Sequence, residues 1–127
     1  MTTILYDMVI DELNKHRIIL ASRSPRRQEL LRELGLNFDV VVRDWSENYP
    51  GYLKGKEIAL YVAIEKAATF KSEIKPNEIV ITADTVVWSN NRLLGKPYDR
   101  KDARRILCKI SGNTHEVITG ICLLSSV

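Results

Sequence analysis

The sequence contains few of the residues that crosslink small secreted proteins or bind zinc. It has only two cysteines, Cys108 and Cys122, which form no C-x-x-C pair and lie near no pair of histidines. This pattern is not typical of a disulfide scaffold or a zinc site. We expect both cysteines to be reduced packing residues, one on a helix and one on a strand, in a cytoplasmic protein.

Charge of one sign is also scarce, and long hydrophobic runs are absent. The formal net charge of +3 is too small by itself to indicate a nucleic-acid-binding protein. Asp7, Asp11 and Glu12 interrupt the apolar N-terminal segment. We therefore expect residues 1–16 to form a short amphipathic leading helix rather than a signal peptide or a membrane span. Neither nucleic acid nor a membrane is expected as a partner.

The chain has neither a P-loop nor a G-x-G-x-x-G pattern, so the common nucleotide-binding signatures are missing. Its length suits a single domain over residues 1–127. Hydrophobic periodicity predicts the order helix, strand, helix, strand, helix, strand, short hairpin strand, helix, strand. This order favours an α/β fold, and the hairpin at Asn90 and Asn91 requires a mixed sheet flanked by helices.

Several element boundaries follow from the same periodicity. The elements that the pattern places most clearly are a strand over 38–42, a helix over 57–74, a strand over 79–88, a helix capped by Asp99, and a last strand over 114–127. Gly120 lies inside the last strand, where a glycine often marks a bend or a bulge. We expect such a bend there.

The stretch from Arg17 to Gly35 has the pattern of a buried strand followed by a tight polar turn and a helix. Ser24 is placed to cap this helix, Pro25 suits its first position, and Gly35 suits its end. The helix N-terminus therefore points beyond the carboxyl end of the strand. Free backbone N–H groups and the positive end of the helix dipole favour an anion at such a position.

Positive charge is concentrated in this same stretch, where residues 17–32 hold five arginines and one acidic residue, Glu29. Arg26 and Arg27, with the hydroxyl of Ser22, are therefore candidates for holding an anion. The simpler alternative is a solvated basic helix start. Arg27 lies four and seven residues before two leucines, on the face expected to pack inward, and an arginine there needs a partner. A phosphate group is a suitable one.

Asp84 lies in the middle of the most apolar segment, Ile79 to Trp88. An unpaired carboxylate in a buried strand would cost several kcal/mol, so Asp84 needs hydrogen bonds, a cation or a metal. The neighbouring threonines and the local backbone could satisfy it. We favour the alternative that it marks the active centre as a metal ligand or general base.

Three further charged residues are candidates for the same site. Lys66 lies on the apolar stripe of its helix, either with its ammonium reaching back to water or directed toward the arginines. Lys96 is held between a glycine and a proline in a constrained loop. Glu47 lies in a long loop, where a glutamate is usually solvated.

These segments taken together resemble the Maf family of nucleoside triphosphate pyrophosphatases, in order and in spacing. The matching motifs are Leu20-Ala21-Ser22-Arg23-Ser24-Pro25-Arg26-Arg27, Glu65-Lys66-Ala67, Ala83-Asp84-Thr85-Val86-Val87, Gly95-Lys96-Pro97 and Ser111-Gly112-Asn113-Thr114-His115. The resemblance covers about residues 17–125. It implies a mixed α/β fold with a deep central cleft, similar to that of the inosine triphosphate pyrophosphatases.

The resemblance also implies an activity, hydrolysis of a nucleoside triphosphate to the monophosphate and pyrophosphate with Mg²⁺ or Mn²⁺. Carried over by position, Asp84 matches the proton acceptor, and Glu47 matches an acidic residue near the metal. The motifs look like the branch that hydrolyses dTTP and UTP, with modified pyrimidine nucleotides as further candidates. The residues that match the phosphate-binding motif and the two cleft lysines are Ser22, Arg26, Arg27, Lys66 and Lys96.

Two further expectations come with the resemblance. The first is an alternative function, because the family's association with septum formation in cell division allows a non-catalytic regulator that binds nucleotide or nucleic acid. The second concerns length, since family members continue for several dozen residues beyond the last strand of this chain. We therefore expect a chain that lacks the C-terminal part of the fold, either as a shortened product or with a partner chain, such as a homodimer, covering the exposed surface.

Overall fold

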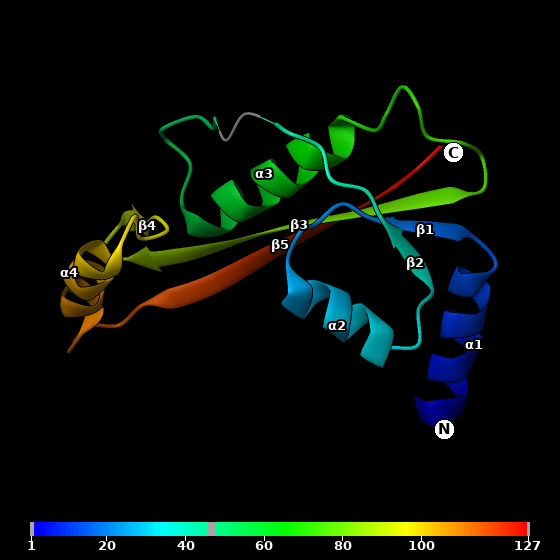
Figure 1. Ribbon diagram of the computed structural model, residues 1–127, viewed down its shortest axis with the longest axis horizontal. Helices are drawn as coiled ribbons and strands as arrows, with labels where there is room; N and C mark the ends of the chain where they lie inside the picture. Colours follow the sequence, from blue (N-terminus) through cyan, green and yellow to red (C-terminus); the bar gives the residue numbers. More distant parts are fainter. Residues whose placement is uncertain (1, 46–47, 127) are drawn as a thin grey trace.

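The computed structural model describes residues 2–45 and 48–126, which form four helices and five strands in the predicted order. Figure 1 shows an elongated molecule in which the longest strand connects its two ends. In chain order the elements are α1 Thr2–Asn14, β1 Arg17–Leu20, α2 Pro25–Glu33, β2 Phe38–Val40, α3 Gly55–Ala68, β3 Glu78–Ser89, β4 Arg92–Leu94, α4 Arg100–Ile110 and β5 Glu116–Ser125.

The sheet is mixed, as the hairpin predicts. Strand β1 pairs in parallel with β2 and with β3, and β3 pairs antiparallel with β4 and β5. Helix α3 runs along β3 and β5, while α2 lies on the opposite side of the sheet (Figure 1). The predicted α/β class with a mixed sheet between helices is confirmed.

Local sequence signals explain where the elements begin and end. The Ser24 hydroxyl accepts a hydrogen bond from the Arg27 backbone N–H at 3.3 Å, and Pro25 is the first residue of α2. After α2, Gly35 adopts a φ of 92°, the left-handed conformation that ends many helices. Asn90 and Asn91 both have positive φ values, which a tight hairpin turn requires.

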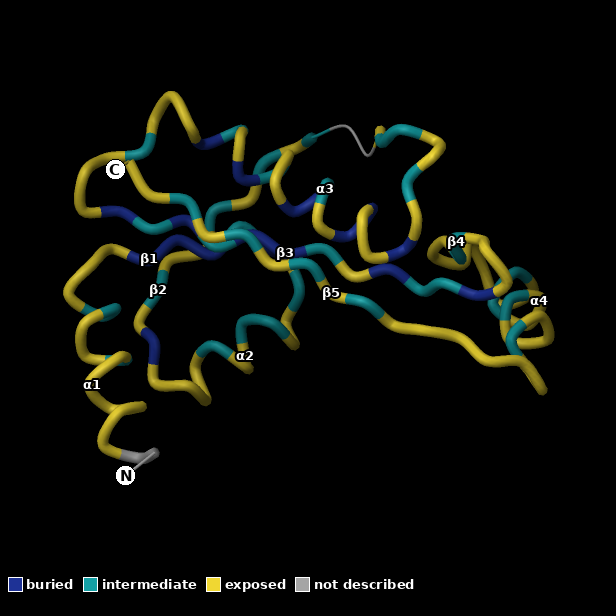
Figure 2. Tube along the Cα trace, turned by 180° about the vertical axis from the view of Figure 1, so that it is seen from behind, coloured by how far each residue is buried: buried dark blue, intermediate teal, exposed yellow. Residues whose placement is uncertain are grey.

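The core lies where β1, β3 and α3 meet, and Figure 2 shows the buried residues concentrated there. Ile18, Leu20 and Val80 are among the most completely buried side chains. Helix α1, helix α4 and most of β5 are exposed instead (Figure 2). The central sheet and α3 therefore form the rigid part of the molecule that positions the residues at its surface.

Helix α3 begins at Gly55, two residues before the predicted span over 57–74, and ends at Ala68, six residues before the end of that span. The backbone N–H groups of Thr69 and Phe70 bond to carbonyls three residues earlier, which tightens the last turn. Phe70 thereby turns into the core against Ile19 and Val80. The prediction failed at this end because the burial of Phe70 continues the apolar pattern after the helix stops.

The predicted bend at Gly120 is wrong, because β5 pairs with β3 in an unbroken register. A Cβ atom at this position would lie 2.6 Å from the backbone carbon and oxygen of Ala59 in α3. The glycine is needed for the close approach of a helix backbone to a strand, which is the other common reason for a glycine in a strand. It therefore sets the distance between α3 and the sheet.

Other boundaries and one packing prediction also need correction. Strand β2 ends at Val40 rather than at Val42, and β5 spans Glu116–Ser125 rather than 114–127. Both cysteines are free, as expected, but Cys108 is exposed on α4 and packs against no core. Among the described residues, no helix is long and apolar enough to cross a membrane.

Candidate functional site

Two adjoining cavities of about 530 and 820 Å³ form one cleft beside the carboxyl end of β1 and the middle of β3. The smaller lies against the turn after β1, and the larger continues toward β4. The cavities have common walls, so we treat them together as the cleft. The residues that line both are Ser24, Arg27, Trp45, Lys66 and Lys96.

The cleft contains every predicted site residue that the structure describes. Ser22 lines the smaller cavity, and Arg26 and Asp84 line the larger one. Arg27, Lys66 and Lys96 line both. The remaining candidate, Glu47, lies outside the described residues. Their roles in binding or catalysis stay predictions at this point, but their convergence is a feature of the fold.

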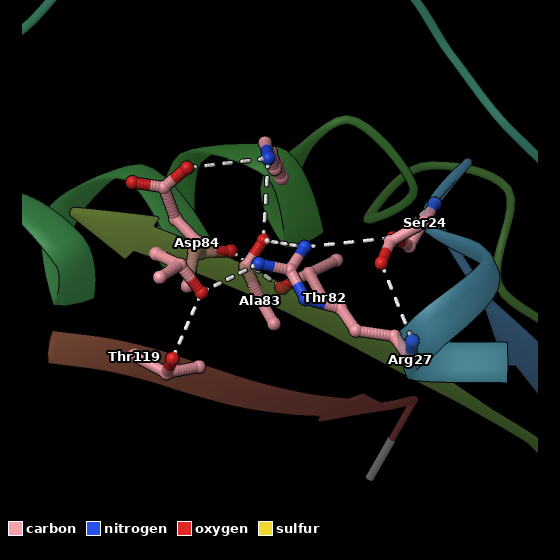
Figure 3. A network of polar contacts seen from close by, with 10 residues as sticks. Ser24, Arg27, Thr82, Ala83, Asp84 and Thr119 are labelled. Carbon is pink, nitrogen blue, oxygen red and sulfur yellow. Dashed lines mark hydrogen bonds and ion pairs between the residues drawn. The ribbon is translucent and has the colours of Figure 1, made fainter. Parts of the chain in front are cut away.

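Arg27 extends from the first turn of α2 to the backbone of β3, as Figure 3 shows. Its Nη1 donates to the carbonyl oxygen of Ala83 at 3.2 Å, and its Nη2 donates to the hydroxyl of Thr85 at 2.8 Å. A weaker bond of 3.5 Å joins Nη1 to the Ser22 hydroxyl. The arginine on the inward face of α2 thus finds partners on the adjacent strand, and these fix its guanidinium at the cleft.

Lys66 reaches the same place from the opposite side of the sheet. Its Nζ donates to the carbonyl oxygen of Ala83 at 3.2 Å and lies 3.6 Å from the Asp84 carboxylate. The ammonium also lies 5.5 Å from the ring centre of Trp45, a cation–π distance. Both ion-pair side chains are about one-fifth exposed, Lys66 21% and Asp84 20%. Lys66 is therefore directed into the cleft and not back to open water.

The electrostatics of the cleft favour an anion. Arg27 and Lys66 donate to the same oxygen, that of Ala83, so two cations are held close together. Like charges at this separation repel, and this repulsion is strongest where water is partly excluded. Within residues 2–45 and 48–126, the acidic residues that line the cleft are Asp84 in the larger cavity and Asp44 in the smaller one, where Asp44 is exposed and pairs with Arg23. A polyphosphate would relieve the remaining repulsion by accepting bonds from both cations.

The other cations differ in how firmly they are held. Arg26 is exposed next to Arg27, and its guanidinium pairs with Glu29 one turn along α2 at 3.3 Å. Lys96 is exposed in the loop after β4. Ser22 is buried, and its hydroxyl accepts the backbone N–H of Ser24 at 3.1 Å. The cleft therefore combines partly buried cations that bond to β3, Arg27 and Lys66, with exposed ones, Arg26 and Lys96.

A metal site made of protein ligands alone does not fit this cleft. The described part of the chain has no group of three or more His, Cys, Asp and Glu side chains that could surround an ion. Mg²⁺, however, is commonly held by one or two carboxylates together with substrate phosphates and water. Asp84 in a cleft with cations fits that second arrangement, in which phosphate oxygens complete the shell.

Trp45, Thr85 and Thr119 are residues of the cleft whose contacts the sequence does not predict. Trp45 lines both cavities, and Thr119 lines the larger one. Thr85 flanks Asp84, but its bond to Arg27 was not foreseen. Nothing in the local sequence of Trp45 signals its contact with Lys66, because the loop between β2 and α3 has no periodicity. The position of Thr119 depends on the pairing of β5 with β3, which single-sequence patterns do not give.

Comparison with known proteins places the chain in a family. The family model described as Maf-like protein matches residues 17–127, which is most of the chain. The chain belongs to the Maf family. The resemblance noted in the five motifs is therefore confirmed, and α1 lies wholly before the part that the Maf model matches.

Relatives of this Maf chain carry a common name, dTTP/UTP pyrophosphatase. The protein of that name from Phocaeicola vulgatus is 50% identical over 116 residues, 91% of this chain and 60% of that protein. The one from Flavobacterium johnsoniae is 46% identical over 115 residues, 91% of this chain and 59% of its own. The Maf chain thus spans about 60% of the length of the curated relatives it matches.

A solved structure also overlaps with the Maf chain. It is described as a nucleoside-triphosphatase, or dITP/XTP pyrophosphatase, from Mycobacterium abscessus. The sequence identity is 13% and the TM-score is 0.39, with 87% of this chain and 75% of the other covered. The fold class rests on the strand pairing described above.

Proposed function

We propose that this chain carries the phosphate-binding and catalytic centre of a nucleoside triphosphate pyrophosphatase that hydrolyses dTTP and UTP to the monophosphate and pyrophosphate. The observation that carries the proposal is the meeting of Arg27 and Lys66 on the carbonyl of Ala83, beside the carboxylate of Asp84. The name shared by the Maf relatives supports the reaction and the pyrimidine substrates. Modified pyrimidine nucleotides are a further substrate class to test.

The cations of the cleft bind and orient the polyphosphate. A nucleoside triphosphate carries about four negative charges, and positioning with charge neutralisation supplies most of the catalysis in phosphoryl transfer. Arg27 presents a planar guanidinium that suits two phosphate oxygens, while Lys66 supplies a point charge beside it. Arg26 and Lys96, which also line the cleft, would add further contacts to the phosphates. No nucleophilic side chain is needed, because water attacks the phosphorus.

Asp84 acts as the base in this proposal. Its carboxylate lies at the cationic centre, where it would orient the attacking water and accept its proton as the bond between monophosphate and pyrophosphate breaks. A divalent cation such as Mg²⁺ or Mn²⁺ would be held by Asp84 with substrate oxygens, and by Glu47 as the family resemblance implies. When bound, the metal supplies further charge neutralisation at the phosphates.

The test is incubation with dTTP or UTP and Mg²⁺, followed by separate assays for pyrophosphate and orthophosphate. We expect pyrophosphate release by the wild type and a loss of at least about a thousandfold for Asp84→Asn, with nucleotide binding retained, because that variant removes the base but no cation. The assay is run on this chain and on a chain extended with the C-terminal part of a relative. Full-rate hydrolysis by Asp84→Asn would remove this residue from the mechanism.

The alternative is a Maf protein that binds nucleotide or nucleic acid without turnover and acts in septum formation. Tight dTTP binding by both chains without pyrophosphate release would support it. A groove for nucleic acid is not favoured by the cleft, because a carboxylate at its cationic centre would have no role in binding backbone phosphates, whereas a hydrolase needs a base there. We also predict a homodimer, which gel filtration would test, and a cytoplasmic location, which cell fractionation would test.

A further inference from the structure

Thr119 interrupts an apolar row on the exposed face of β5. Val117, Ile121 and Leu123 lie on the same face, and each is more than 60% exposed. Thr119 is the member of the row that lines the larger cavity of the cleft. Its hydroxyl lies beside that of Thr85, which is a partner of Arg27.

A chain of two hydrogen bonds links Thr119 to Arg27. Thr119 is paired with Thr85 in the register of β3 and β5, and the two hydroxyl oxygens are 2.8 Å apart. The Thr85 hydroxyl also accepts the bond from Arg27 Nη2 at 2.8 Å. Figure 3 shows Thr119 on β5 joined through the next strand to the guanidinium. Thr119 and Arg27 are thus connected through one side chain.

The chemistry of the groups fixes the direction of the first of these bonds. A guanidinium has donors and no acceptor, so the oxygen of Thr85 must accept from Arg27. The Thr85 oxygen has a second lone pair and one proton, so between the two threonines either hydroxyl can donate. Thr85 is exposed, so without Thr119 its side chain would be free to adopt another rotamer, in which the hydroxyl bonds to water instead of to Arg27. The Thr85 hydroxyl therefore makes two hydrogen bonds, one to Thr119 and one to Arg27 Nη2. The bond to Nη2 is the shortest of the side-chain hydrogen bonds described for the Arg27 guanidinium.

We propose that Thr119 is a positioning residue for Arg27, acting through Thr85, and that its hydroxyl tightens the binding of a polyphosphate anion in the cleft. The proposal rests on the anion-binding part of the proposed function, but not on turnover. The guanidinium must present fixed N–H groups to phosphate oxygens, and freedom of Thr85 would loosen that geometry.

The test measures binding of inorganic tripolyphosphate to this chain by calorimetry at fixed ionic strength. Thr119→Val keeps the shape of the side chain and removes the hydroxyl, and we expect it to weaken binding about three- to tenfold, as loss of one neutral hydrogen bond would. Thr119→Ser restores the hydroxyl and should bind within about twofold of the wild type. Thr114→Val makes the same chemical change outside the cleft and should have no effect.

A double-mutant comparison separates positioning from direct contact with the anion. In a Thr85→Val chain the link to Arg27 is already broken, so adding Thr119→Val should change the affinity less than twofold. Two additive losses, an unchanged Thr119→Val, or no tripolyphosphate binding by the wild type would each overturn the inference. Turnover of dTTP is measured separately, so that tripolyphosphate binding that depends on Thr119 without pyrophosphate release would contradict the proposed function and leave this inference standing.

Discussion

At the scale of single residues, the neighbouring arginines Arg26 and Arg27 lie in one sequence motif but in different environments. Arg27 donates to Ala83 and Thr85 on the adjacent strand, whereas Arg26 is exposed and pairs with Glu29 on its own helix. An exposed ion pair at this spacing contributes little. The inner arginine is therefore the one whose guanidinium geometry matters, and the outer one contributes mainly charge.

This difference predicts unequal effects of the same substitution. Arg27→Lys keeps the charge but loses the planar fork, so we expect tripolyphosphate binding to weaken by about tenfold or more. Arg26→Lys should change it by less than about threefold. Calorimetry on the two variants at equal ionic strength measures both. Equal losses would show that the guanidinium of residue 27 has no special geometry.

The sequence pointed to Asp84 and Arg27 because each places a charge where the pattern expects an apolar contact. It gave no such signal for Trp45, Thr85 or Thr119, whose importance comes from contacts between distant segments. A residue that breaks a local pattern can be found from one sequence. A residue that matters through its neighbour across the sheet needs the register, which the structure supplies.

At the scale of elements, the sequence predicts local caps and turns correctly, but it does not predict contacts between distant segments. Ser24, Pro25 and Gly35 delimit α2 as predicted, because each acts on its own few residues. Gly120 marks no bend, because its role depends on Ala59 in α3, about sixty residues away in the chain. The end of α3 was missed for the same reason, since Phe70 is buried by tertiary contacts.

The cap of α2 predicts a measurable effect on stability. Ser24→Ala removes the hydroxyl that accepts the Arg27 N–H, so the free energy of unfolding should fall by about 1 kcal/mol. Ser24→Thr keeps an oxygen in this place and serves as the matched control. Urea denaturation followed by circular dichroism gives both values. An alanine variant as stable as the wild type would show that the cap is not a stabilising contact.

The contact between α3 and β5 predicts a larger effect. Gly120→Ala places a methyl group against the backbone of Ala59, so we expect a loss of about 1–3 kcal/mol or more, as overpacking causes. Gly51→Ala is the matched control, because a Cβ there would meet no atom within 4 Å. The two urea midpoints are compared directly. If both variants unfold at the same midpoint, α3 does not rest on β5 as described.

At the scale of the whole molecule, a charge network holds three strands together at the end of the sheet far from β4. Arg17 on β1 bonds to Asp39 on β2 at 3.0 Å and to Glu78 on β3. The backbone N–H of Lys75, together with Arg17, lowers the pKa of the Glu78 carboxyl, although burial opposes this. Folding is therefore coupled to ionisation of this group.

The sign of this coupling sets a pH prediction. A carboxyl whose pKa is lower in the folded state stabilises the fold above the ordinary glutamate pKa, and this stabilisation is lost as the pH falls below about 4.3. Glu78→Gln should therefore be less stable than the wild type at neutral pH, and the difference should shrink in acid. Urea titrations between pH 7 and pH 3 measure it. A difference that does not depend on pH would contradict the assignment.

The central claim for the whole molecule is that β1, α2, α3 and β3 bring separate charges to one cleft for a polyphosphate tail. The most direct measurement is a crystal structure of this chain with Mg²⁺ and the non-hydrolysable analogue α,β-imido-dTTP. We predict phosphate oxygens within hydrogen-bonding distance of both Arg27 and Lys66, with Asp84 facing the reacting phosphorus. A nucleotide bound elsewhere on the surface, or one whose phosphates contact neither cation, would contradict the account.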